Sequence, residues 1–195
     1  MSNIPELTRL IDEAAFAPEV FDRNLGQIAR MLGYDHGALV YSELDVPYYV
    51  ATEETLAGLN AYTKEGWLAA DFRARYIAPF PIGRIFADNI HVPAEQRLSS
   101  DIYNTLYKRH DMANYVGWKF SIDDSMWIYS FARSERGGPV RPEDIRLLQQ
   151  MAKAANRSAL VAQRLRSARM DGMLDGLARV GVAALALSRD GRMLQ

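Results

Sequence analysis

The chain has 195 residues, of which 49% are hydrophobic, with 23 basic and 24 acidic side chains and no cysteine. This length can bury a core for one domain or slightly more. The absence of cysteine excludes a disulfide framework, a thiolate metal site and a cysteine nucleophile. Charged side chains interrupt the first 16 residues, and no uncharged run is long enough to span a bilayer. The sequence therefore predicts a cytoplasmic protein with no membrane segment.

The net charge of −1 conceals two opposed regions. Residues 1–60 hold ten acidic and three basic side chains, so the basic excess lies in the rest of the chain. Between Lys153 and Arg169 there are five bases and no acid. The simplest interpretation of this run is a solvated helix face, and the alternative is contact with the acidic N-terminal region of the same or a second subunit. Neither region is charged enough to predict nucleic-acid binding by itself.

The first half of the chain alternates between helical and extended patterns. Apolar residues at helical spacing predict two amphipathic helices, at about residues 5–16 and 18–32. Residues 36–42 then form a predicted buried strand, with residues 48–51 as its hairpin partner. A further helical segment is predicted at residues 55–72.

The second half begins with a break in the pattern, because two prolines and a glycine predict an irregular loop at residues 77–92. A helix is predicted at residues 93–112, and two strands at residues 115–122 and 126–133 form a second hairpin. A long helix without proline or glycine follows from Glu143 to Asp171. This order predicts an α+β fold in which helices flank an antiparallel sheet.

The long helix carries an apolar seam that alternates strictly between steps of three and four residues, the spacing of a coiled coil or a packed helix pair. The seam consists of Ile145, Leu148, Ala152, Ala155, Ala159 and Ala162. Because the helix is longer than one small sheet needs, we expect these residues to form the dimerisation surface of a homodimer.

The segment after the helix is apolar from Val182 to Leu187 and continues through a turn sequence into the start of a second strand. A hairpin without further partners is marginal in water. We therefore expect three parts: a domain at residues 1–142, a connector and dimerisation helix at 143–178, and the start of a truncated hairpin domain at 179–195.

Catalytic and metal-binding signals are missing from the sequence. The three histidines, His36, His91 and His110, are far apart and outside any metal-ligand pair. The glycine-rich phosphate-binding motifs and the GxSxG nucleophile motif do not occur. We predict no catalytic residue, no metal site and no cofactor.

The aromatic residues are concentrated, since 16 of the 20 lie between Tyr48 and Phe131. The simplest interpretation is a small core built from large side chains. The alternative is a ligand cavity lined by rings with a few fixed polar groups. Four residues have the character that such a cavity needs: Tyr62, Trp67, Asp71 and Arg73. The carboxylate and guanidinium of this set could equally form a surface pair at a helix end.

A wider set of spaced residues carries a family resemblance: Tyr62, Trp67, Asp71, Arg73, Asp88, Tyr103, Trp118, Trp127 and Arg133. The run Gly-Gly-Pro-Val-Arg-Pro-Glu-Asp-Ile then precedes the alanine-rich helix. Over residues 15–195 this pattern resembles the N-terminal sensor region of bacterial LuxR-type helix-turn-helix transcription regulators. In that family a GAF-like or PAS-like domain precedes a helical connector and a DNA-binding module, and residues 177–195 look like the opening hairpin of a PAS domain.

The resemblance implies a non-enzymatic, GAF/PAS-like sensory domain that binds a small molecule and passes the signal through a dimerising helix by a population shift. The implied ligand-binding residues are Tyr62, Trp67, Asp71, Arg73, Tyr103, Trp118 and Trp127. The acyl-homoserine-lactone-binding branch uses a tryptophan, a tyrosine and an aspartate at a comparable place, which this chain matches in part, so the ligand is not identified. DNA binding would need a helix-turn-helix that this sequence lacks. A ligand-free dimerisation scaffold and a small enzyme with an unsignalled site are the alternatives.

Overall fold

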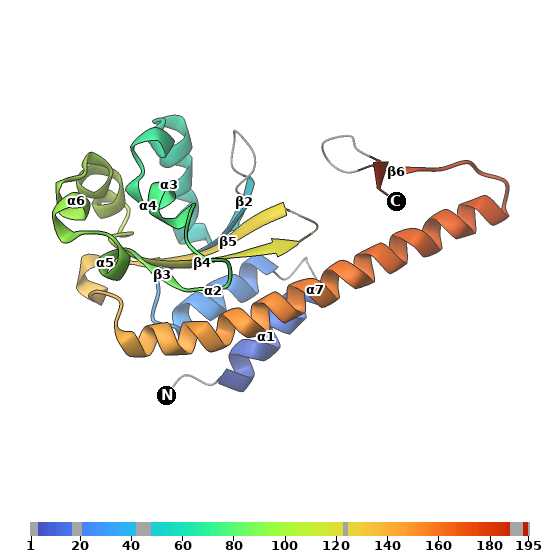
Figure 1. The fold of residues 1–195 in the computed structure, drawn as a ribbon, viewed down its shortest axis with the longest axis horizontal. Helices are drawn as coiled ribbons and strands as arrows, with labels where there is room; N and C mark the ends of the chain where they lie inside the picture. The colour runs from blue at the N-terminus through green and yellow to red at the C-terminus, as the bar shows by residue number, and fades with distance from the viewer. Residues whose placement is uncertain (1–3, 17–20, 42–47, 123–124, 188–192, 195) are drawn as a thin grey trace.

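A computed structural model describes residues 4–16, 21–41, 48–122, 125–187 and 193–194 (Figure 1). The α-helices are α1 (Ile4–Phe16), α2 (Phe21–Met31), α3 (Glu53–Lys64), α4 (Phe72–Ile77), α5 (Asp88–His91), α6 (Ala94–Ser99) and α7 (Pro142–Arg179). Shorter helical turns of other types are η2 (Trp67–Ala70), η3 (Tyr103–Tyr107) and η4 (Glu135–Gly137). The strands are β1 (His36–Tyr41), β2 (Tyr48–Ala51), β3 (Phe86–Ala87), β4 (Asn114–Ile122), β5 (Ser125–Arg133), β6 (Ala186–Leu187) and β7 (Met193–Leu194).

The central sheet has five strands in the order β2-β1-β5-β4-β3, and every neighbouring pair is antiparallel. The α+β prediction is therefore confirmed, and both predicted hairpins, β1–β2 and β4–β5, are present. The strand β3 and the helix α5 were not predicted, because the sequence reads as an irregular loop at residues 77–92. A two-residue strand is too short to produce a periodic signal.

One face of the sheet is a solid core covered by α1, α2 and α7 (Figure 1). The strands direct their largest side chains to this face, since successive residues of a strand point to opposite sides. The indole of Trp118 is completely buried there, with its ring stacked 4.8 Å from Tyr129 and 5.8 Å from Phe131. Rings of this size bury much apolar surface, so this face supplies most of the hydrophobic stabilisation.

The helix α7 confirms the predicted long helix but corrects the predicted role of its seam. The side chains of Leu148, Ala152 and Ala155 are buried in the core of the chain itself, where they share a cluster with Leu7 and Leu10 of α1. The flanking seam residues, Ile145 and Ala159, are partly buried against the same cluster, and the side chain of Ala162 lies outside the described part. The first helix of the same chain thus occupies the place that we had expected a second subunit to fill.

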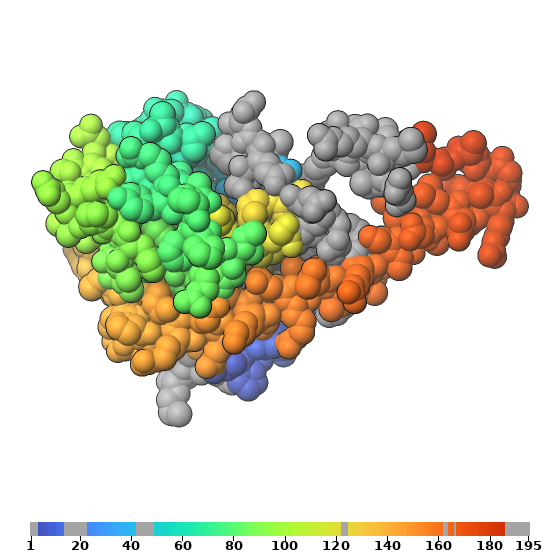
Figure 2. Space-filling view, viewed as in Figure 1, coloured from blue at the N-terminus to red at the C-terminus, as the bar shows by residue number. Residues whose placement is uncertain are grey.

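The C-terminal part of α7 leaves the body of the protein (Figure 2). Large apolar side chains are exposed along it, with Leu160 at 50% and Met173 at 59% of their full accessibility. The basic side chains of Lys153, Arg157 and Arg169 are also exposed, which agrees with a solvated helix face. Among the described residues, this half of α7 has no core of its own.

The strands β6 and β7 pair antiparallel after α7, which confirms a hairpin at the end of the chain. Its turn, residues 188–192, lies outside the described residues. The expectation that residues 179–195 begin a further PAS-like domain remains a prediction. None of the helices in the described ranges has the length and apolar character needed to cross a membrane.

Candidate functional site

A cavity of about 450 Å³ lies on the other face of the sheet, beneath α3, α4 and η3. Its walls are predominantly apolar and include Val40, Leu59, Ile77, Leu106 and Ile128. The volume falls within the roughly 300–1,000 Å³ of typical small-molecule sites. This face of the sheet is therefore hollow where the α7 face is packed solid.

Small residues lie side by side on three adjacent strands below the cavity, and two of them, Ala38 and Ser130, line it. Ser130 of β5 pairs with Ala38 of β1 on one side and with Gly117 of β4 on the other. A Cβ added at Gly117 would lie 2.5 Å from the Tyr115 hydroxyl and 2.6 Å from the Tyr129 carbonyl oxygen, so no larger residue fits without movement. The Tyr115 side chain lies over Gly117, whereas Ala38 and Ser130 line the cavity.

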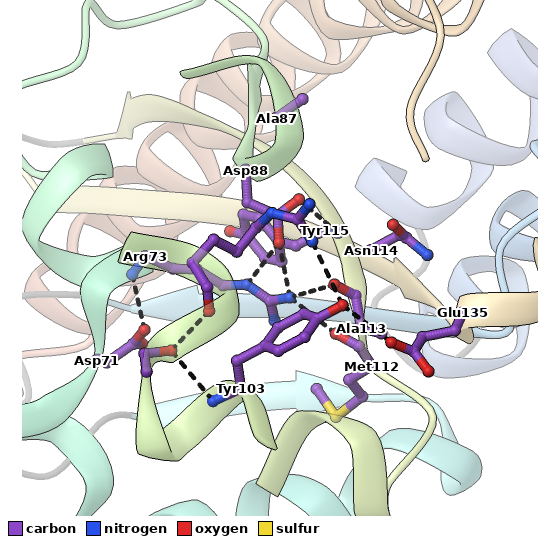
Figure 3. A network of polar contacts seen from close by, with 12 residues as sticks. Asp71, Arg73, Ala87, Asp88, Tyr103, Met112, Ala113, Asn114, Tyr115 and Glu135 are labelled. Carbon is purple, nitrogen blue, oxygen red and sulfur yellow. Dashed lines mark hydrogen bonds and ion pairs between the residues drawn. The ribbon is translucent and has the colours of Figure 1, made fainter. Parts of the chain in front are cut away.

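A buried ion pair anchors one end of this region (Figure 3). The guanidinium of Arg73 donates through Nε and Nη2 to Asp88 Oδ2, at 3.0 and 2.8 Å, and through Nη2 to the carbonyl oxygens of Met112 and Ala113. It lies 3.6 Å from the ring centroid of Tyr107. Burial by itself lowers the pKa of Arg73, but the charge of Asp88, the neighbouring Tyr107 and Asp71, and the hydrogen bond to Asp88 together outweigh it and raise that pKa. The pair ties α4, α5 and the start of β4 together.

Asp71 places a carboxylate beside the cavity. It is the N-cap of α4, where Oδ1 accepts a 2.8 Å hydrogen bond from the Arg73 backbone N–H. Its other oxygen accepts a 3.1 Å hydrogen bond from the Tyr62 hydroxyl. Burial and the nearby Asp71 charge raise the pKa values of Tyr62 and Tyr107, so both phenols remain neutral donors. Both Asp71 and Arg73 are buried, and the alternative of a surface pair is therefore wrong.

Further polar groups are spread around the apolar walls. The hydroxyls of Tyr115 and Ser130 are 3.0 Å apart, and burial raises the pKa of Tyr115 to about 12. His36 Nδ1 lies 3.5 Å from Thr55 Oγ1, and burial lowers the pKa of its imidazole. Lys119 Nζ donates to the Ala78 carbonyl oxygen.

Three of the seven predicted ligand-binding residues line the cavity: Tyr62, Asp71 and Arg73. Trp118 and Trp127 point to the opposite face of the sheet. Trp118 is enclosed in the solid core, and Trp127 is packed against that core with its ring centroid 5.2 Å from Tyr41. Their strand positions explain this, because Trp118 pairs with Tyr129 and Trp127 with Phe120, all on the α7 side.

The other two predicted residues lie outside the lining of the cavity. Trp67 is half-buried in η2, and its Nε1 donates a 2.8 Å hydrogen bond to Glu65. The hydroxyl of Tyr103 donates to Glu135 at 3.2 Å. Both residues pack in the cluster behind the cavity wall and shape it only indirectly.

Several lining residues were missed by the sequence interpretation, namely His36, Thr55, Tyr107, Tyr115 and Lys119. Strand parity contains a signal for two of them. Tyr115 and Lys119 alternate with Trp118, so they face the side opposite to the solid core. In the part of the chain that the structure describes, no cluster of three histidine or carboxylate side chains is arranged to hold a metal ion.

No protein-family model matches the sequence, and no curated protein sequence matches it significantly. Solved structures do share the fold. CepR2 from Burkholderia cenocepacia, an N-acylhomoserine-lactone-dependent LuxR-family transcription factor, is 14% identical with a TM-score of 0.61, covering 85% of this chain and 96% of its own. The LBD domain of VqsR from Pseudomonas aeruginosa is 18% identical with a TM-score of 0.60, covering 80% and 93%.

Escherichia coli SdiA is also similar, at 16% identity and a TM-score of 0.57, covering 96% of this chain and 75% of its own. At these identities the likeness shows the fold, which is the α+β fold of these regulator domains. The LuxR-type resemblance is thereby supported at the level of the fold, whereas the GAF/PAS-like designation remains a prediction.

Proposed function

We propose that this chain is a non-enzymatic sensory domain of a cytoplasmic transcription regulator and binds a small amphiphilic ligand in the cavity above the sheet. The observation that carries the proposal is the cavity itself, about 450 Å³ in volume, with apolar walls and the Asp71 carboxylate fixed beside it. The fold shared with a lactone-dependent transcription factor supports the same class of function.

The ligand contributes an apolar portion and a hydrogen-bond donor. The apolar portion fills the space beside Ile77, Leu106 and Ile128. The donor binds Asp71, because a carboxylate has about four acceptor positions and the bonds from Tyr62, Tyr107 and the α4 backbone leave one position for it. Charge-assisted hydrogen bonds of this kind orient a ligand that apolar contacts alone would leave free to slide.

The signal passes from β5 to α7. Ser130 and Ala132 face the cavity, while the next residue, Arg133, points to the other side. There Arg133 donates to the carbonyl oxygens of Gly138 and Pro139, at 2.9 and 2.7 Å, and pairs with Asp144 in the first turn of α7. A ligand that prefers one position of β5 thereby biases the start of α7.

A second copy of the chain binds along the projecting half of α7, where Leu160, Leu165 and Met173 are exposed. This exposed surface replaces the seam that begins at Ile145 as the proposed dimer surface. A DNA-binding output module would be carried by a longer protein. Light scattering after size-exclusion chromatography tests the dimer, and a monomer at high micromolar concentration would contradict it.

Thermal-shift assays with N-octanoyl-homoserine lactone, 10-hydroxydecanoic acid and methyl 10-hydroxydecanoate, each of which carries a hydrogen-bond donor for Asp71, test the ligand-binding function. We expect at least one of them to raise the melting temperature of the wild type. Ala38→Phe fills the cavity from its floor and abolishes the shift, whereas Ala168→Phe on the exposed part of α7 leaves it unchanged. A wild type that no member of the panel stabilises, with the same melting temperature throughout, favours the ligand-free scaffold.

A further inference from the structure

Lys119 places an ammonium group at the edge of a cavity whose walls are predominantly apolar. The residue lies in β4, is 9% exposed, and lines the cavity. An ammonium group has three donors. One is used by the Ala78 carbonyl oxygen at the end of α4, and no carboxylate of the described residues lies within ion-pair distance of it.

The other buried basic side chains show how the chain normally treats such a charge. Arg73 lies 2.8 Å from Asp88, and Arg133 lies 3.1 Å from Asp144. The ammonium of Lys119 is partly buried, and even partial burial of a charge without a counter-ion has a cost, because solvation is lost and no ion pair replaces it. In agreement, burial lowers the pKa of Lys119. The charge of Lys119 is therefore the one among these three that lacks its counter-ion within the described chain.

The position of Lys119 sets it apart from the acidic end of the cavity. It follows Tyr115 by four residues on β4, a distance of about 13 Å along an extended strand. The ring of Tyr115 lies 4.9 Å from the Arg73 guanidinium, at the end that contains Asp71 and Asp88. Apolar side chains, among them Ile77 and Ile128, line the same cavity. The cavity thus has an acceptor at one end and a cation toward the other.

We propose that Lys119 binds a carboxylate of the ligand, so that the cavity selects an elongated acidic amphiphile over its neutral ester. This inference rests on the proposed ligand-binding function and narrows the class of ligand. Lys119 also has a structural role, because its bond to Ala78 stabilises the C-terminal end of α4. A purely structural lysine would affect stability without affecting the choice between an acid and its ester.

Isothermal titration calorimetry with 8-hydroxyoctanoic, 10-hydroxydecanoic and 12-hydroxydodecanoic acids and their methyl esters, below their micelle concentrations, separates the two roles, since the terminal hydroxyl of each supplies the donor for Asp71. We expect the wild type to bind at least one acid about tenfold or more tightly than its ester, as a charge-assisted hydrogen bond implies. Lys119→Met loses this preference, whereas Lys119→Arg keeps it. Lys64→Met removes an exposed lysine from α3, outside the cavity lining, and is the matched control.

The ratio of acid to ester affinity is the decisive quantity, since a general loss of stability weakens both ligands together. Lys119→Gln provides a second neutral variant if Lys119→Met does not fold. Equal affinities for acid and ester in the wild type, or binding of the lactone without any acid, overturn the role of Lys119 and leave the ligand-binding function standing. Failure of the acids, the esters and the lactone to bind overturns the proposed function itself.

Discussion

The two faces of the same sheet are packed differently: one carries a core of large side chains, and the other borders a cavity. On the α7 face, Trp118, Phe120 and Tyr129 are buried in a large apolar cluster with residues of α1, α2 and α7. On the other face, the neighbouring residues Ala38 and Ser130 have small side chains, and they line the cavity. Because alternate residues of one strand serve the two faces, stability and binding can be altered separately by changing neighbouring residues.

The largest expected effect lies on the solid face. Trp118→Ala should lower the free energy of unfolding by about 3–5 kcal/mol, because the buried ring is lost and a cavity remains among close-packed neighbours. Urea denaturation monitored by far-UV circular dichroism measures the change. A loss below about 1 kcal/mol, within the range of ordinary surface substitutions, would show that this face is not the main source of stability.

An effect of similar size is expected at the ion pair behind the cavity. Arg73→Met should destabilise the protein by about 3–5 kcal/mol, since it leaves the Asp88 carboxylate buried without its partner. The double variant Arg73→Met with Asp88→Asn should recover much of the loss, because the unpaired charge is removed. If this double variant is no more stable than Arg73→Met alone, the loss of stability comes from lost packing rather than from the unpaired Asp88 charge.

A smaller effect on stability is expected at the cavity. Tyr62→Phe removes the hydroxyl that donates to Asp71 and should cost about 1 kcal/mol of stability. It should also change the affinity for the lactone, because the carboxylate loses a donor that fixes its orientation. Calorimetry compares Tyr62→Phe with Tyr76→Phe, which removes a part-buried hydroxyl that donates to Gln96 at 2.7 Å and lies outside the cavity lining. Equal losses of lactone affinity in the two variants would remove Asp71 from the site.

The smallest expected effect depends on pH. Burial lowers the pKa of His36 in the folded chain, whereas the unfolded chain keeps a value of about 6.5. As the pH falls below about 6.5, the unfolded state therefore binds more protons than the folded state, and the free energy of unfolding decreases. Above this pH, the titration of His36 has no effect on stability. Urea denaturation between pH 5 and pH 8 should show this decrease in the wild type. His36→Gln should remove part of it, and an unchanged pH profile in this variant would place the effect elsewhere.

The difference between the two faces also explains what could be predicted from the sequence. The strands β4 and β5 and the helix α7 produce long periodic patterns, and these were located correctly. The sequence does not indicate that α1 fills the seam around Leu148 and Ala152, because an apolar stripe does not identify its partner. The error of placing Trp118 in the site was avoidable, since strand parity sets it opposite Lys119.

The cavity itself could not be predicted in the same way. It depends on small residues from two strands, Ala38 and Ser130, that become neighbours only through the register of the sheet. Asp71 could be singled out from the sequence, because a carboxylate among aromatic residues is unusual, and the structure places it in the cavity lining, while its ligand-binding role remains a prediction. Arg73 was identified as a site residue, yet its side chain is held by Asp88 and serves chiefly to fix the cavity wall.

NMR titration of isoleucine methyl groups with N-octanoyl-homoserine lactone, or with the tightest-binding acid of the panel, tests the central contrast most directly. Ile77 and Ile128 line the cavity, whereas Ile11 and Ile28 belong to the α7 face. The two-faced account predicts saturable shifts for Ile77 and Ile128 with little change at Ile11 and Ile28. Shifts confined to Ile11 and Ile28, or no saturable shift with any member of the panel, would contradict it.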